Sequence, residues 1–403
     1  MNRLWLLTLF LLVPMLISSC TRNAPLTDHS SPSPRANSPM PAVNDTWNQF
    51  QLQYRDEMMQ LEASAQASHT ANPEPPVPPT RMDIRGLYVS AHAAQGEFLE
   101  SILETIRSSN LNAVVLDVKD DYGRMMYASE VPLVGQLRAD AKPILPDIRQ
   151  TLQRLKEEGI YTIGRVVAFK DPLFAKAKPE YAIQNKSGGV WQDGKGVSWV
   201  DPYRDEVLRY NIDIAVEAVK LGFDEIQYDY VRFPENGEKL DAEAAFFNPN
   251  RWSKEQIIAA FLRMAKEQIH REGKPLSADV FGMIATARDD MGIGQNWSLL
   301  TQQVDVISPM VYPSHYGAGL YGVDHPDLEP YRIIASTIQD AIERNRELDQ
   351  GAAIRPWLQA FTATWIDPHQ TYGPAQVQEQ VRALKDLGIE QYLLWNPSCR
   401  YNL

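Results

Sequence analysis

Short apolar runs alternate with amphipathic stretches along most of the chain after residue 80. This alternation predicts successive strand–helix units and a parallel sheet. Pro356 lies inside the seventh apolar run, and because a proline cannot donate a ladder hydrogen bond, this run fits a regular strand least well. Eight strands are predicted, at residues 86–90, 113–118, 161–167, 225–230, 276–281, 304–310, 354–359 and 392–395.

Apolar residues recur at helical spacing between these strands. A glycine follows each of four such stretches, and glycine at that place is typical of a left-handed helix C-cap. Strands and helices together predict an α/β protein with a (β/α)8 TIM barrel over residues 81–403. The last strand ends a few residues before Leu403, so we expect the barrel to lack a C-terminal eighth helix. The four stretches and their glycines are 148–155 with Gly159, 207–219 with Gly222, 257–269 with Gly273, and 377–387 with Gly388.

The first 19 residues have the pattern of an export signal. Arg3 precedes an apolar run at residues 4–17 that is short for a membrane-spanning helix, which predicts a signal peptide. The sequence Ile-Ser-Ser-Cys at residues 17–20 resembles a bacterial lipobox. The resemblance implies that Cys20 carries lipid and anchors the protein to a membrane of the cell envelope. The alternative is an ordinary cleaved signal peptide that is followed by a cysteine.

Residues 20–80 are predicted to form a tether that is rich in proline and serine, and its first part, residues 21–41, cannot bury a core. Within it, apolar residues at steps of three and four predict a helix at residues 44–67. Two interpretations stay open: this helix packs where the eighth barrel helix is missing, or it is a free part of the tether. The chain has two cysteines, so a lipid on Cys20 leaves Cys399 without an intramolecular disulfide partner.

Charge narrows the choice of partners. The 403 residues carry a formal net charge of −12, and no dense basic stretch is present, which argues against a nucleic-acid partner.

His92 stands between two alanines, and the spacing of His315, Asp324 and His325 matches no standard metal site. We therefore expect neither a metal nor a cofactor.

Two aspartates are the candidate catalytic pair. Asp229 ends the fourth predicted strand and Asp279 lies in the fifth, at the end of the strands where barrels carry their active sites. Adjacent strands lie about 4.8 Å apart, so the two carboxyl groups can fall within the separation of about 5–9.5 Å that glycosidases use. In such enzymes one carboxyl protonates the leaving oxygen and the other is nucleophile or base. Alternatively, Asp279 is a buried structural carboxylate bound to Arg165 or Arg232.

Polar and aromatic residues at the same end of the barrel are candidates for substrate binding. Trp191 and Trp199, in the long loop after strand three, are expected to wall a sugar subsite, with loop packing as the alternative. Asp120 is either a ligand of the substrate or part of a solvated turn. The full set is Asp120, Arg165, Lys170, Trp191, Trp199, Gln227, Arg232, Tyr312, His315, Gln359, Trp395 and Asn396.

Four motifs resemble those of a bacterial glycoside hydrolase family that is related to α-amylase-like barrels. Residues 222–234 read Gly-Phe-Asp-Glu-Ile-Gln-Tyr-Asp-Tyr-Val-Arg-Phe-Pro and resemble the strand-four motif of that family. Residues 85–88, 277–282 and 308–313 are similar to its motifs at strands one, five and six. The resemblance implies a glycosidase-type barrel with Asp229 as nucleophile or base. For the partner acid we choose Asp279 from several candidate residues.

Chitinase-like barrels fit less well, because their strand-four run of acids at alternate positions ends in glutamate, where this chain has Val231. The leading hypothesis is thus an envelope-anchored glycoside hydrolase that acts on an extracytoplasmic polysaccharide. A carbohydrate-binding envelope lipoprotein without catalytic activity is the alternative, and a scaffold for envelope assembly is a third.

Overall fold

The computed structural model describes residues 83–348 and 351–403. The predicted signal peptide, the predicted lipidation site at Cys20, the predicted tether and the predicted helix at residues 44–67 all lie outside the described residues. Among the residues that are described, no helix combines the length and the apolar character that crossing a membrane requires.

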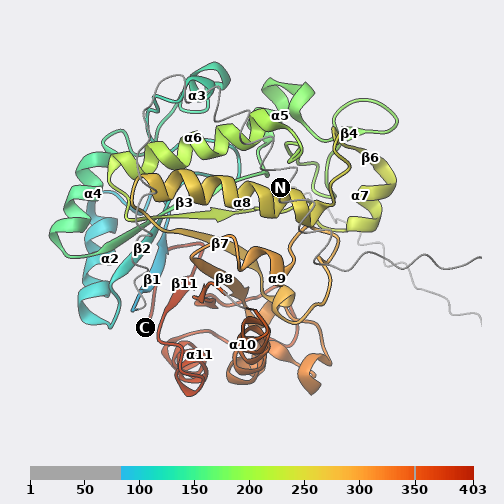
Figure 1. Cartoon of the computed structure of the whole chain (residues 1–403). Coiled ribbons are helices and arrows are strands. Elements are labelled where there is room, and N and C mark those ends of the chain that lie inside the picture. Colours follow the sequence, from blue (N-terminus) through green and yellow to red (C-terminus); the bar gives the residue numbers. More distant parts are fainter. Residues whose placement is uncertain (1–82, 349–350) are drawn as a thin grey trace, which may run out of the picture. The chain divides into compact units, whose positions relative to one another are not determined.

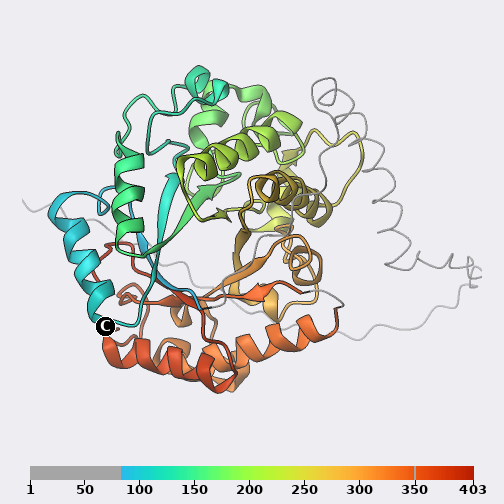
Figure 2. The same cartoon turned by 60° about the vertical axis from the view of Figure 1, so that its left-hand side comes forward.

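Parallel strands form a closed barrel, as predicted (Figures 1 and 2). The first strand pairs with the last, and β10 pairs with both β8 and β11, which closes the ring. The predicted seventh strand is split at Arg355 and Pro356, so β9 and β10 together occupy one position of eight. The strands are β1 (Arg85–Val89), β2 (Ala113–Lys119), β3 (Tyr161–Val167), β5 (Glu225–Asp229), β7 (Leu276–Phe281), β8 (Val306–Val311), β9 (Ala353–Ile354), β10 (Trp357–Gln359) and β11 (Tyr392–Trp395).

Helices cover the outside of this barrel, as Figure 2 shows. In Figure 1, α6 and α8 lie side by side on one flank, and α10 and α11 lie together on another. Residues 396–403, after β11, contain no helix. The helices are α2 (Gly96–Ser108), α3 (Pro132–Leu137), α4 (Ile148–Glu157), α5 (Pro172–Ala177), α6 (Asp205–Leu221), α7 (Gly237–Glu243), α8 (Lys254–Arg271), α9 (Trp297–Leu300), α10 (Pro330–Arg346) and α11 (Pro374–Asp386).

The ends of the elements follow from local chemistry. Gly159, Gly273 and Gly388 adopt the left-handed conformation that their positions predicted, with φ of 71°, 72° and 76°. Gly222 has φ of 126° instead. The predicted strand at 304–310 begins at Val306, because the chain bends at the residue before it. A second, two-stranded sheet outside the barrel joins β4 (Gln184–Asn185) to β6 (Ala244–Ala245).

A buried ion pair crosses the barrel interior near the start of β5. Arg355 Nη1 lies 2.8 Å from Glu225 Oε1, and both side chains are almost fully shielded from solvent. Ser277 donates a further hydrogen bond to the same carboxylate oxygen. Arg355 lies at the break in the seventh strand, and its guanidinium group is the cation that pairs with Glu225.

We predict that Arg355→Met lowers the free energy of unfolding by about 3–5 kcal/mol, because it leaves the Glu225 carboxylate buried and uncompensated. The double variant Glu225→Gln/Arg355→Met should lose less than the sum of the two single variants, as measured by urea denaturation. The exposed pair of Arg107 with Glu158 is the control, and Arg107→Met should change stability little. Equal effects of Arg355→Met and Arg107→Met would contradict a structural role for the buried pair.

Candidate active site

A pocket of about 490 Å³ opens at the carboxyl ends of the barrel strands. It brings together seven of the predicted site residues, including both candidate catalytic aspartates. A larger groove of about 980 Å³ lies on the outside of the barrel, beside α2 and α4, away from this set of side chains. The pocket is lined by Arg165, Lys195, Asp229, Tyr230, Arg232, Glu235, Asp279, Phe281, Gly282, Met283, Met310, Tyr312, His315, Tyr316, Trp357 and Trp395.

Asp229 ends β5 and is paired with a guanidinium group. Arg165 donates hydrogen bonds to Asp229 Oδ2 from Nε at 3.0 Å and from Nη2 at 2.5 Å. The backbone N–H of Tyr230 donates to the other oxygen at 2.6 Å. Tyr230 has φ of 49°, so the chain leaves the strand by a left-handed turn at this residue. These contacts fix the orientation of the Asp229 carboxylate at the pocket wall.

The same guanidinium also binds a second carboxylate. Arg165 Nη1 donates to Asp117 Oδ1 at 2.7 Å, and Tyr88 donates its hydroxyl hydrogen to Asp117 Oδ2 at 2.6 Å. All three side chains are buried. Arg165 is thus fixed from both sides across β2, β3 and β5, and Asp117 acts as an orienting group for it.

Asp279 has a different environment. The β5–β7 register pairs Tyr228 with Ala278, so Asp229 and Asp279 are the next residues along their neighbouring strands. Trp357 donates its indole N–H to Asp279 Oδ1 at 2.7 Å. Burial, followed by the negative charge of Asp229, raises the pKa of the Asp279 carboxyl well above its ordinary value. Neither Arg165 nor Arg232 forms an ion pair with Asp279 among the contacts of the described residues, so this carboxyl is not the partner of either guanidinium.

Aromatic rings surround the two carboxyl groups. The Trp395 ring lies 5.6 Å from that of Trp357 and 4.3 Å from that of Tyr88, measured between centroids. Its face also receives the Arg165 guanidinium at 5.7 Å. On the β8 side, Tyr312 and His315 are in edge contact at 5.4 Å. A pocket with charged groups at its centre and aromatic walls suits a ligand that is both polar and partly apolar, as sugar rings are.

Arg232 lines the same pocket from the turn after β5. Its Nη2 donates to Glu235 at 3.0 Å, and its guanidinium stacks over the Phe281 ring at 4.5 Å. Burial lowers the pKa of Arg232 from its ordinary value. Glu235 is mostly exposed, so the pocket has a third carboxylate at its mouth.

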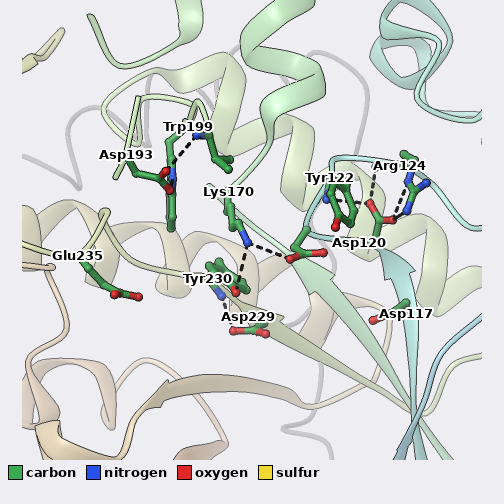
Figure 3. Close-up of polar contacts among 12 residues, drawn as sticks. Asp117, Asp120, Tyr122, Arg124, Lys170, Asp193, Trp199, Asp229, Tyr230 and Glu235 are labelled. Atoms are coloured by element: carbon green, nitrogen blue, oxygen red, sulfur yellow. Dashed lines mark hydrogen bonds and ion pairs between the residues drawn. The ribbon is translucent and has the colours of Figure 1, made fainter. Parts of the chain in front are cut away.

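Trp191 and Trp199 do not wall this pocket, contrary to the expected sugar subsite. Both rings are buried within the loop after β3. Trp191 donates its indole N–H to Glu243 at 3.1 Å, and Trp199 donates to Asp193 at 3.0 Å. Figure 3 shows Trp199 turned toward Asp193. Trp191 thus binds a residue of α7, and Trp199 also packs against Tyr230, so the two rings fix the loop to the rest of the barrel, which was the alternative interpretation.

Lys170 and Asp120 also lie outside the pocket lining. Lys170 Nζ binds Asp121 at 2.9 Å and lies over the Tyr230 ring at 4.6 Å (Figure 3). Asp120 accepts hydrogen bonds from the backbone N–H groups of Tyr122 and Arg124, and it forms an ion pair with the Arg124 guanidinium. Asp120 thus closes a turn after β2.

Three more predicted residues support the site from behind. Gln227 is fully buried in the barrel and donates to Ser308 at 3.2 Å. Gln359 accepts hydrogen bonds from the backbone and hydroxyl groups of Ser314. Asn396 donates to the carbonyl groups of Ala360 and Arg400. Gln359 and Asn396 fix loops at the rim, whereas Gln227 joins β5 to β8 inside the barrel, and none of the three lines the pocket.

Sequence reasoning missed Trp357, Tyr88 and Glu235. Trp357 lies two residues before Gln359 on the same strand, so the strand period of two places both on one face and could have indicated it. Tyr88 carried no such signal, because its partner Asp117 is 29 residues away in sequence. Within residues 83–348 and 351–403, no group of three or more His, Cys, Asp or Glu side chains is arranged to hold a metal ion.

Comparison with known proteins places this barrel among glycoside hydrolase folds. Residues 86–401 match the family described as “Putative glycosyl hydrolase domain”. A hypothetical protein from Ruminiclostridium thermocellum is 36% identical, over 51% of this chain and 98% of that one, with a TM-score of 0.44. No curated protein matches the chain.

Two solved structures share the fold at low sequence identity. The PgaB (BpsB) glycoside hydrolase domain from Bordetella bronchiseptica has a TM-score of 0.55 and 12% identity, covering 79% of this chain and 95% of that one. The β-galactosidase from the psychrophilic Marinomonas ef1 has a TM-score of 0.54 and 12% identity, covering 78% and 54%.

We predict that Asp279→Asn changes how stability depends on pH. A raised pKa means that the folded state keeps a proton that the unfolded chain releases above about pH 3.9. Wild-type stability should therefore fall as the pH rises from that value toward the folded pKa, and Asp279→Asn should lack this part of the decline. Urea unfolding of the wild type and of Asp279→Asn between pH 4 and 8 measures this pH dependence, and Asp289→Asn, at an exposed residue, is the control. Parallel profiles for wild type and Asp279→Asn would refute the assignment.

Proposed function

Because the chain belongs to the family described as “Putative glycosyl hydrolase domain”, we propose that it hydrolyses O-glycosidic bonds, with Asp279 as general acid and Asp229 as nucleophile or base. The observation that supports this proposal best is that the neighbouring carboxyl groups of Asp229 and Asp279 have different environments. Arg165 forms a close ion pair with Asp229, whereas burial and the charge of Asp229 raise the pKa of Asp279. When two neighbouring carboxyl groups have environments that differ in this way, the one with the raised pKa is suited to act as the acid and the other as the base or nucleophile.

Both carboxyl groups take part in the proposed reaction. Asp279, whose raised pKa favours the protonated form, transfers its proton to the glycosidic oxygen as that bond breaks. Asp229, on the neighbouring strand, either attacks the anomeric carbon or removes a proton from the attacking water. The indole N–H of Trp357 stays on Asp279 Oδ1 and stabilises the carboxylate after the proton has left. Tyr312, His315 and Trp395 supply the surfaces that contact the sugar.

We further propose that the substrate is an extracytoplasmic polysaccharide and that lipid on Cys20 holds the enzyme in the cell envelope. The support is the sequence of residues 1–20, with its short apolar run and its lipobox-like end. Residues 20–80 would then place the barrel at a distance from the membrane.

The two aspartates should respond differently to substitution. Asp229→Asn is expected to abolish hydrolysis of both natural glycans and nitrophenyl glycosides. Asp279→Asn should lower kcat/KM about 10²–10⁴-fold on natural glycans but much less on nitrophenyl glycosides, whose leaving group needs little protonation. Reducing-end release from a panel of soluble glycans measures the first activity, and nitrophenol absorbance measures the second. Asp289→Asn is the matched control and should behave as wild type.

Binding of glycans by the wild type without any release of reducing ends would overturn the enzymatic assignment and leave a carbohydrate-binding protein. Equal loss on both substrate types in Asp279→Asn would remove the general-acid role from Asp279 alone.

Cys20→Ala should release the protein from the membrane fraction and prevent incorporation of labelled palmitate, because the lipid would have no sulfur to join. Cys399, which is buried in the segment after β11, supplies the control. Cys399→Ala should stay with the membranes. If Cys20→Ala also fractionates with the membranes and takes up label, the lipoprotein proposal fails.

A further inference from the structure

Trp365 exposes a large aromatic ring on the loop that follows β10. Its side chain is 65% exposed, whereas Trp297, Trp357, Trp191 and Trp199 are all buried. Exposed tryptophan leaves a large apolar face in water, and such residues are typical of binding surfaces. The ring therefore needs an explanation that core packing does not give.

The ring belongs to an ordered aromatic cluster, which we call the rim platform and define as Trp365, Phe361 and His315. Trp365 and Phe361 are stacked, with centroids 5.9 Å apart and planes inclined by 18°. His315 meets both rings edge-on, at 6.4 Å from Trp365 and 6.3 Å from Phe361. One face of the stack is thus supported by other rings, and Trp365 presents the exposed part of the cluster.

Buried hydrogen bonds hold the loop of the rim platform in place. Asp327 is 2% exposed, and its carboxylate accepts hydrogen bonds from Gln359 Nε2 and from the backbone N–H of Gln370, both at 3.0 Å. Tyr372 donates its hydroxyl hydrogen to the Asp327 carbonyl at 3.0 Å. Thr362 accepts from the backbone N–H of Tyr372. A ring on a loop fixed in this way loses little conformational freedom when a ligand stacks on it.

The rim platform is continuous with the pocket. His315 lines the pocket and also touches Trp365. Tyr312 lines the pocket and meets Phe361 edge-on at 5.8 Å. A ligand that fills the pocket and extends past the β8 side therefore reaches the platform next.

We propose that the rim platform is a second sugar subsite, in which Trp365 stacks on the apolar face of a sugar residue next to the one held in the pocket. The proposal rests on the glycosidase function proposed above. It makes the substrate a chain that spans pocket and platform, and it excludes a monosaccharide glycoside as the natural substrate. The subsite is separate from Trp191 and Trp199, whose rings are buried.

Binding as a function of chain length tests this subsite. The probes are cello-, chito- and xylo-oligosaccharides of one to six residues, titrated by calorimetry into protein that carries Asp229→Asn, so that turnover does not interfere. Trp365→Ala in this background should weaken binding of the longer chains about tenfold, the equivalent of one lost aromatic contact, and leave the monosaccharide unchanged. Trp365→Tyr should restore most of the affinity.

Phe247→Ala is the matched control, because Phe247 is an exposed aromatic residue, at 49%, that lies outside the pocket lining. It should bind every chain length as the parent does. The subsite is overturned if Trp365→Ala and its parent have the same affinity for every probe, including the case in which neither binds. It is also overturned if all chain lengths, the monosaccharide among them, lose affinity equally, since that indicates a structural defect.

The two proposals fail in different ways. Chain-length-dependent binding that needs Trp365, in a wild type that releases no reducing ends, would keep the subsite and remove the hydrolase. Hydrolysis of polymers with a KM that Trp365→Ala does not change would keep the hydrolase and remove the subsite.

Discussion

Arg165 is the group on which the geometry of the site depends. A guanidinium group offers donors in a rigid planar fork, and here the fork joins Asp117 on β2 to Asp229 on β5 through a side chain that starts on β3. Because three neighbouring strands meet in one buried cation, their relative position at the carboxyl end is fixed by a contact stronger than ladder hydrogen bonds. The orientation of Asp229 follows from this bridge.

The bridge also contributes to the state of Asp279, whose raised pKa is caused first by burial. A neutral partner at Asp229 would leave Asp279 affected mainly by burial, whereas an anion on the next strand adds electrostatic repulsion to the cost of ionisation. Trp357 opposes this effect by donating to Asp279, but its single hydrogen bond is the weaker influence. One cation bound to one of two carboxyl groups thus makes two chemically identical side chains different.

Much of the barrel could be predicted from the alternation of apolar and amphipathic segments, because each strand is short, buried and bounded by polar turns. In the sequence, only Pro356 indicated that the seventh strand is interrupted. Asp229 and Asp279 could be paired in advance because the order of strands in a barrel makes consecutive strands neighbours, and both residues lie at corresponding positions.

The loops were not predictable in the same way. Trp191 and Trp199 have the composition of a binding surface, but their partners Glu243 and Asp193 decide that they are buried. Whether an aromatic residue faces solvent depends on such partners, which lie 52 residues from Trp191 and six residues from Trp199, and neither spacing leaves a periodic signal. Trp365 shows the converse, since nothing in its local sequence distinguishes it from the buried tryptophans.

The ion pair of Glu225 with Arg355 lies at the opposite end of β5 from Asp229. A buried guanidinium group therefore holds each end of this strand, because Arg355 binds its first residue and Arg165 binds its last. Glu225 and Asp229 are four residues apart and so lie on the same face of the strand. A slip of β5 by one residue along its neighbours would break both ion pairs at once and turn Asp229 to the other face, so the two contacts together fix the register of the strand that carries the proposed catalytic carboxylate.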